Sequence, residues 1–330
     1  MAATSNLEVS THVYKEVDGL SLTLDVFRPI NTSASDAGPQ VALIHYHGGF
    51  LVIGEKTTFP PSWLINACVR RGWIYITPAY RLLPEAQGVD VVADALDAAK
   101  WVTESLSTRL IVAGSSAGGL LALSVATQLT RPLAVLSVYG MLDLTSTRYI
   151  EQGTMLMGNP PIPDVRPILD QIEAAKKDAV LDGYPFPSHP PTDKRMLWIA
   201  VAHQEAIYPD LLTGHAGLAG MIRKGGIDAI PTNLRHLFPV AFALRGDLPP
   251  TAFLHGDDDN AIHVDQSIKV AEALNKLGVK VTCEIVPGKG HGFDVREIPA
   301  TVDIESDTNT NLPMYKSLRS ILAFLDGVVN

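Results

Sequence analysis

The pattern of hydrophobic and polar positions predicts two kinds of strand. In residues 8–17 and 20–27 apolar and polar side chains alternate, and Asp18-Gly19 between these segments is a strong signal for a hairpin. After the polar stretch 31–40, which predicts a loop, short uninterrupted apolar runs follow, as in strands that are buried on both faces. These runs are residues 41–45, 73–77, 110–113, 133–138, 251–254 and 280–286.

Amphipathic stretches of helix length lie between the apolar runs. They cover residues 61–71, 89–106, 117–129, 264–277 and 312–328. Strands that alternate with helices predict an α/β fold, in which a mostly parallel sheet is covered by helices on both faces.

The alternation is interrupted between residues 145 and 245. Proline-rich stretches at 158–163 and 185–191 separate helical pieces such as 165–179 and 196–211, and no clear strand is visible. We therefore predict that residues 145–245 form a helical cap inserted into the α/β core. The two parts of this core are residues 1–144 and 246–330.

Composition and charge restrict the possible partners. Hydrophobic residues make up 46% of the 330 positions and charged residues 18%, which is enough apolar material for a large core. The net charge of −9 disfavours nucleic acids and anionic membranes, because both are held mainly by an excess of Lys and Arg. The sequence has no secretory signal and no apolar run of about 20 residues, so we expect a cytoplasmic protein without stable membrane insertion. Cys68 and Cys283 lie outside any metal-binding motif, and both are expected to be small buried side chains.

A glycine-rich turn interrupts one apolar run. The predicted strand 110–113 leads directly into Gly114-Ser115-Ser116-Ala117-Gly118, and a helical pattern follows. At such a strand-turn-helix junction the middle serine is strained and its hydroxyl is exposed, while glycines on either side allow strand and helix to approach. A phosphate-binding loop is the alternative, but neither Gly-x-x-x-x-Gly-Lys-Ser/Thr nor Gly-x-Gly-x-x-Gly is present. Ser116 is therefore a candidate nucleophile.

A serine nucleophile requires a histidine base and an acid that orients the histidine. His291 lies in the glycine-rich loop 287–293, directly after a predicted strand, where it can reach over the carboxyl edge of the sheet. The strand before it leads into three consecutive aspartates, of which Asp259 best fits a turn back toward the histidine and Asp258 is the second choice. The chain order of serine, aspartate and histidine matches that of the α/β hydrolases.

The third requirement is a set of donors for the oxyanion that forms during acyl transfer. The stretch His47-Gly48-Gly49-Phe50 follows the predicted strand 41–45, and its backbone N–H groups can turn into the same cavity. The first helical amide after the serine, from Ala117, points to the same place. Gly48, Gly49, Phe50 and Ala117 are therefore the candidate oxyanion-hole residues.

Taken together, these residues resemble the hormone-sensitive-lipase-like branch of the α/β-hydrolase superfamily. The resemblance rests on His47-Gly48-Gly49, on Tyr80-Arg81-Leu82-Leu83-Pro84-Glu85, on the serine turn, on Asp259 and on His291-Gly292-Phe293, and it covers residues 41–144 and 248–293. It implies an eight-stranded sheet with a helical cap, and a carboxylesterase or lipase without cofactor or metal. It also implies that Ser116 is the nucleophile, His291 the general base and acid, and Asp259 the orienting carboxylate.

Two of the stretches that carry the resemblance have further implications. The oxyanion loop of this family usually reads His-Gly-Gly-Gly, and Phe50 takes the place of the third glycine here, so its ring should narrow or shape the pocket. The stretch 80–85 is interpreted as architectural, holding the site in place rather than reacting.

The expected substrate is a small molecule, a medium-sized and largely apolar carboxylic ester or acyl compound. Most apolar side chains of the cap are expected to pack its own core, and the remainder to form the substrate wall. The candidates are Met155, Met157, Phe186, Trp198, Tyr208, Phe238 and Phe242. Alternatives are a tailoring enzyme of secondary metabolism that hydrolyses, lactonises or cyclises a polyketide-like acyl group, an arylformamidase, and a small-molecule receptor that has lost catalysis. The sequence leaves a homodimer open.

Overall fold

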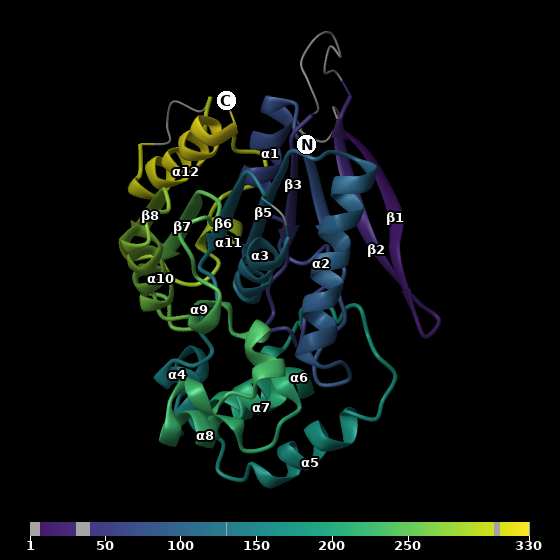
Figure 1. The fold of residues 1–330 in the computed structure, drawn as a ribbon, viewed down its shortest axis with the longest axis vertical. Coiled ribbons are helices and arrows are strands. Elements are labelled where there is room, and N and C mark those ends of the chain that lie inside the picture. Colours follow the sequence, from purple (N-terminus) through teal and green to yellow (C-terminus); the bar gives the residue numbers. More distant parts are fainter. Residues whose placement is uncertain (1–6, 31–39, 130, 307–310, 330) are drawn as a thin grey trace.

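A single eight-stranded sheet forms the centre of the part of the chain that the computed structural model describes, residues 7–30, 40–129, 131–306 and 311–329 (Figure 1). The strands are β1 (Leu7–Val17), β2 (Leu20–Pro29), β3 (Ala42–Tyr46), β4 (Ile74–Pro78), β5 (Leu110–Ser115), β6 (Ala134–Val138), β7 (Thr251–Gly256) and β8 (Val281–Val286). Their order in the sheet is β1-β2-β4-β3-β5-β6-β7-β8. Among these described strands, β2 pairs antiparallel with β1 and with β4, and every other pair is parallel, which confirms the predicted mostly parallel sheet.

The hairpin of β1 and β2 forms where the sequence predicts it. Val17 pairs with Leu20, and the two residues between them, Asp18 and Gly19, have φ of 48° and 85°. Positive φ at both positions is the geometry of the tight turn for which Asp-Gly is favoured. The predicted loop 31–40 lies, except for Gln40, outside the described residues.

Helices cover both faces of the sheet. On one face α2 (Gly88–Ser105), α3 (Ala117–Gln128) and α10 (Asp265–Lys276) pack on the strands, and on the other α1 (Ser62–Arg71) and α12 (Pro313–Val329) do so (Figure 1). Every residue of β3 to β7 is buried, because these strands have a helical layer on each side. This explains why their sequences read as uninterrupted apolar runs.

The predicted cap segment consists of short helices at one end of the molecule, the lower end in Figure 1. Its α-helices are α4 (Thr147–Ile150), α5 (Arg166–Ala175), α6 (Lys194–Gln204), α7 (Tyr208–Thr213), α8 (Leu218–Gly225) and α9 (Pro239–Phe242). The prediction of one helix over residues 196–211 is wrong, because the chain turns at Ala206 with φ of 54° and restarts with Pro209 in the first turn of α7.

One buried arginine joins the cap to the core. Arg195, on α6, is 1% exposed and forms an ion pair with Glu85. Its guanidinium also donates hydrogen bonds to the backbone carbonyls of Val52, at 2.8 Å, and Leu83, at 3.0 Å. Arg81 of the same stretch pairs with the buried carboxylate of Asp94. Both ion pairs agree with the architectural interpretation of residues 80–85.

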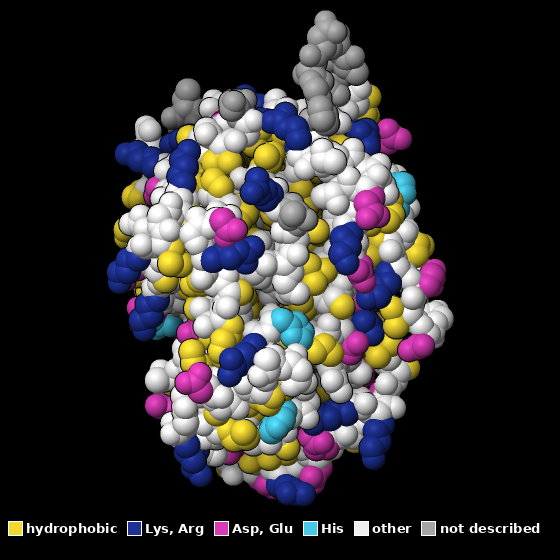
Figure 2. Space-filling model, in the orientation of Figure 1, with side chains coloured by type: hydrophobic (Ala, Val, Ile, Leu, Met, Phe, Trp, Pro, Cys, Tyr) yellow, Lys and Arg dark blue, Asp and Glu magenta, His cyan; other side chains and the backbone are white. Residues whose placement is uncertain are grey.

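The surface and the cysteines complete the description. Side chains of both charges are interspersed over the face that Figure 2 shows. Cys68 is buried as predicted, but Cys283 is exposed, so that prediction is wrong. Cys283 belongs to β8, which is an edge strand with a neighbour on one side only. Within the described residues, no helix has the length and apolarity to cross a membrane.

Candidate active site

The serine turn forms at the carboxyl end of β5. Ser116 lies between β5 and α3 with φ of 55° and ψ of −123°, a strained conformation for a residue with a side chain. A Cβ on Gly114 would lie 2.0 Å from the carbonyl oxygen of Gly118, and one on Gly118 would lie 2.1 Å from that of Tyr46. The turn therefore forms only with glycine at both positions, as the sequence predicts.

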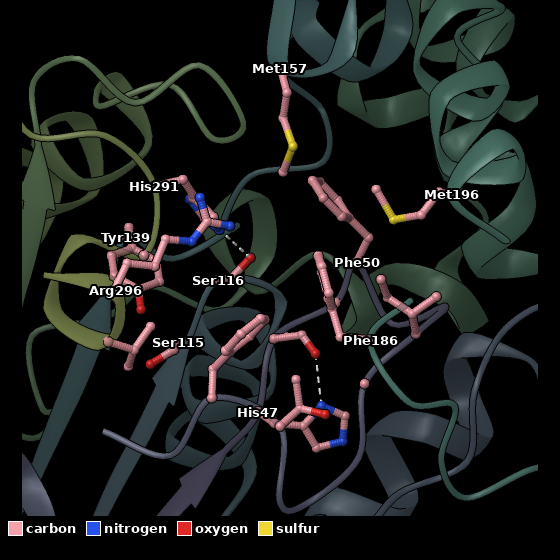
Figure 3. A pocket seen from close by; sticks show the side chains of 18 of the residues that line it. His47, Phe50, Ser115, Ser116, Tyr139, Met157, Phe186, Met196, His291 and Arg296 are labelled. Carbon is pink, nitrogen blue, oxygen red and sulfur yellow. Dashed lines mark hydrogen bonds between the residues drawn. The ribbon is translucent and has the colours of Figure 1, made fainter. Parts of the chain in front are cut away.

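The structure brings the predicted serine, histidine and aspartate together. Nε2 of His291 lies 3.0 Å from Oγ of Ser116 (Figure 3). Its Nδ1 lies 2.7 Å from Oδ2 of Asp259. The three residues follow the carboxyl ends of β5, β7 and β8, which meet at one edge of the parallel sheet. The arrangement can take the proton of the serine hydroxyl and pass it to a leaving group.

The carboxylate of Asp259 has four hydrogen-bond donors. Oδ1 accepts from the backbone N–H groups of Ala261 and Ile262, each at 2.9 Å, and Oδ2 lies 3.2 Å from Nε2 of His255 besides its bond to His291. Burial by itself raises the pKa of Asp259, but the hydrogen bonds from the two histidines and from the backbone outweigh it. They hold the pKa well below its usual range, so this carboxylate is ionised at neutral pH.

The two other aspartates of the run have different environments. Asp258 is exposed and does not contact His291 through a hydrogen bond in the described residues. The carboxylate of Asp257 accepts a hydrogen bond of 2.6 Å from the backbone of Gly288, which ties the aspartate loop to the histidine loop. The structure therefore places the first choice, Asp259, beside the histidine.

The loop after β3 lies directly against the serine. A Cβ on Gly48 would be 2.8 Å from Cβ of Ser116, and Gly49 has φ of 114°. Phe50 follows with φ of 56°, although it is not a glycine, and its carbonyl accepts a hydrogen bond from the Tyr208 hydroxyl. Among the described residues, the backbone N–H groups of Gly49 and Phe50 donate no hydrogen bond. Free donors at this place are what an oxyanion would use.

Two buried histidines support the same loop. His45 contacts Ser115 through Nε2 at 2.8 Å, and His47 is stacked on Tyr80 with ring centroids 4.2 Å apart. Burial lowers the pKa of His45 to about 3, with a further contribution from His47, and burial lowers the pKa of His47 to about 4. Both rings are therefore neutral at pH 7. Nδ1 of His47 donates to the carbonyl of Gly48 at 2.7 Å, which fixes the bend of the loop.

The pocket above the serine is lined mainly by apolar side chains (Figure 3). Phe50 and Phe59 come from the core, and Met157, Phe186 and Met196 come from the cap segment. Of the seven cap residues predicted as candidates, Met157 and Phe186 line this pocket. Trp198, Tyr208 and Phe238 are buried in the packing of the cap, Met155 is 51% exposed, and Phe242 lies against Arg235.

The sequence did not single out four residues that belong to the site. Tyr139 follows the end of β6, its ring lies 4.6 Å from that of His291 between centroids, and its hydroxyl donates to the buried Asp294. His255 contacts the aspartate, and Met196 and Arg296 line the pocket. Tyr139 and His255 could have been found from their position in the sequence, because each lies at the carboxyl end of a predicted strand.

The eight-stranded, mostly parallel sheet with helices on both faces has the α/β hydrolase fold. Residues 43–164 match the model of a family described as having the α/β hydrolase fold, and residues 233–302 match the model of the prolyl oligopeptidase family. The match over residues 43–164 and the shared fold confirm the resemblance to the hormone-sensitive-lipase-like α/β hydrolases that the sequence indicates.

Two solved structures and one curated relative are similar to this chain over most of its length. An esterase of Pyrobaculum calidifontis, 20% identical, has a TM-score of 0.59 over 98% of this chain and 86% of its own. Esterase 2 of Thermogutta terrifontis, phosphonylated by sarin and 19% identical, has a TM-score of 0.60 over 97% and 95%. Preu6 of Preussia isomera, a non-reducing polyketide synthase, is 28% identical over 91% of this chain, which spans only 14% of the synthase. The overall fold is thus that of esterases.

Proposed function

We propose that this protein is a serine hydrolase that cleaves carboxylic acyl bonds through Ser116, His291 and Asp259. One observation carries the proposal. The hydrogen-bond chain from the serine hydroxyl to the buried carboxylate ends beside the free N–H donors of the loop after β3. A nucleophile, a base, an orienting acid and an oxyanion site at one point are the components of acyl transfer.

The reaction follows from the roles of these groups. His291 takes the proton of Ser116 as the oxygen attacks the acyl carbon, and the backbone N–H groups of Gly49, Phe50 and Ala117 stabilise the oxyanion. The carbon–oxygen or carbon–sulfur bond then breaks, and the leaving group departs with the proton from the imidazolium. Water attacks the acyl-enzyme in the same way, which releases the acid and restores the serine. The ionised Asp259 stabilises the imidazolium in both halves.

A second candidate within this chemistry is the hydrolysis of polyketide acyl thioesters. The match of 91% of the chain to part of a non-reducing polyketide synthase favours it, because such synthases build acyl chains that are bound as thioesters. The apolar pocket with Phe50, Met157 and Phe186 would accept an aromatic or alkyl acyl group.

The proposal is tested with p-nitrophenyl butyrate and a fluorophosphonate probe. Ser116→Ala should lower the initial rate by at least about 10³-fold and abolish labelling by the probe. Ser124→Ala is the matched control, because this serine lies on α3 and its buried hydroxyl has no partner among the described residues. Equal activity of Ser116→Ala and the wild-type protein would refute the proposal, and unlabelled, inactive wild-type protein would favour the receptor alternative.

A further inference from the structure

Two cavities meet at His291. The first is the apolar pocket above the serine, which is lined by the loop after β3 and by Ser116. The second is lined mainly by polar side chains, with Met157 and Phe293, and contains neither the serine nor that loop. Its lining includes Asp258, Asn260 and Glu297, together with Met157, His291 and Arg296, which it shares with the first cavity.

The position of the second cavity relates it to one part of the substrate. The acyl carbon has to lie between Ser116 and the donors of the loop, so the acyl group occupies the first cavity. The leaving group has to lie on the side of His291, because this imidazole gives it a proton. The second cavity adjoins His291 and excludes the oxyanion site, so it is placed to receive the leaving group.

Arg296 is the cation at the boundary between the two cavities. It lies five residues after His291, at the end of α11 (Phe293–Arg296), and Figure 3 shows its guanidinium beside the imidazole. The side chain is exposed and makes no hydrogen bond or ion pair within the part of the chain that the structure describes. By contrast, Glu297 next to it is paired with Lys289. The donors of the guanidinium are therefore free for a ligand.

The chemistry of the second cavity selects the kind of leaving group. Arg296 and the Asn260 amide supply hydrogen-bond donors, and Asp258, Glu297 and the Asn260 carbonyl supply acceptors. Lys289 neutralises Glu297, and Asp258 offsets the charge of Arg296, so these four side chains have no excess positive charge for a phosphate. A bare alkyl chain would leave the polar groups of the cavity without partners. A neutral chain that carries amide groups satisfies both donors and acceptors.

We infer that the second cavity is a leaving-group subsite for an amide-bearing thiol, of the kind found at the thiol end of a pantetheine arm. The guanidinium of Arg296 donates to the first amide carbonyl of that arm. This inference rests on the proposed acyl-transfer function. In the step concerned, the carbon–sulfur bond breaks as the acyl-enzyme forms, and the thiol leaves with the proton from His291.

The test compares two thioesters that differ by the amide. S-butanoyl-N-acetylcysteamine carries it, and S-pentyl thiobutanoate has an alkyl chain in its place. In Arg296→Met, kcat/KM for the first substrate should fall about 10-fold, mostly through KM, while that for the second should change less than about 2-fold. Arg296→Lys should recover part of the loss. Arg166→Met is the matched control, since this arginine of α5 is 80% exposed and lies outside both cavities.

The outcomes separate the two proposals. Equal losses for both thioesters in Arg296→Met overturn the subsite, and so does a wild-type protein that does not cleave the amide thioester while it cleaves p-nitrophenyl butyrate. A loss confined to the corresponding coenzyme A thioester would show that Arg296 contacts a phosphate, which also overturns the amide assignment. Failure of the acyl-transfer function itself is recognised independently, by unchanged ester hydrolysis in Ser116→Ala.

Discussion

Mild acid should destabilise this protein well above the pH at which carboxylates titrate. Three histidines, His45, His47 and His203, are between 0% and 3% exposed. Burial lowers the pKa of His45 to about 3 and that of each of the other two to about 4. Nε2 of both His47 and His203 is buried without a hydrogen-bond partner among the described residues, so a second proton on this nitrogen would have no acceptor.

The sign and size of the effect follow from proton linkage. A histidine whose folded-state pKa is lowered stays neutral while the unfolded chain takes up a proton, so stability is full above about pH 6.5 and falls as the pH drops toward 4. Between pH 7 and pH 5.5, each such histidine lowers the free energy of unfolding by about 1.3 kcal/mol. Three together lower it by about 4 kcal/mol, a large part of the stability of a typical domain.

The assay is urea unfolding, followed by tryptophan fluorescence at several pH values between 5 and 7.5. His203→Leu removes one buried imidazole from α6 and should reduce the acid-induced loss between pH 7 and 5.5 by about 1.3 kcal/mol. His263→Leu is the control for loss of an imidazole, because that side chain is 62% exposed. A wild-type loss below about 1 kcal/mol, or an undiminished loss in His203→Leu, would refute the reasoning.

Three further changes test the site. Asp259→Asn should lower kcat for p-nitrophenyl butyrate about 10⁴-fold and Asp258→Asn less than about 3-fold, because only the first carboxylate is bonded to the histidine; equal initial rates would contradict this. Gly48→Ala should lower kcat at least about 10-fold, since the added Cβ would lie against the serine, and an unchanged kcat would mean that the loop can retreat. Tyr208→Phe should lower kcat by about 5-fold through loss of one hydrogen bond to the oxyanion loop; unchanged kcat would show that the loop keeps its shape without that bond.

The parts of the fold and site that the sequence predicted are those set by local backbone requirements. Gly114 and Gly118 lie where a Cβ would collide with backbone atoms, so the serine turn is visible as a motif. The same holds for Asp18-Gly19, whose positive φ values belong to a tight hairpin. The central strands are buried along their whole length, so their sequences are uninterrupted apolar runs that predict them directly.

The remaining features depend on contacts between segments that are distant in the sequence. The chain turns at Ala206 with a positive φ, and because this residue is not a glycine, the sequence does not indicate the turn. Two helices are therefore predicted as one. Met196 reaches the pocket only because α6 is fixed over the loop after β3. The exposure of Cys283 follows from the position of β8 at the edge of the sheet, which periodicity does not reveal. In the sequence nothing distinguishes Arg296 from other charged residues. Only the tertiary structure places it between the two cavities.

The anchoring of α6 by Arg195 limits how the cap can open. The guanidinium is fully buried and bound to Glu85 and to two carbonyls of the core, and separating such a pair from one partner costs about 3–5 kcal/mol. Helix α6 therefore stays attached to the core when other parts of the cap move. We therefore expect a bulky substrate to enter by displacement of the segments that carry Met157 and Phe186, while α6 stays in place.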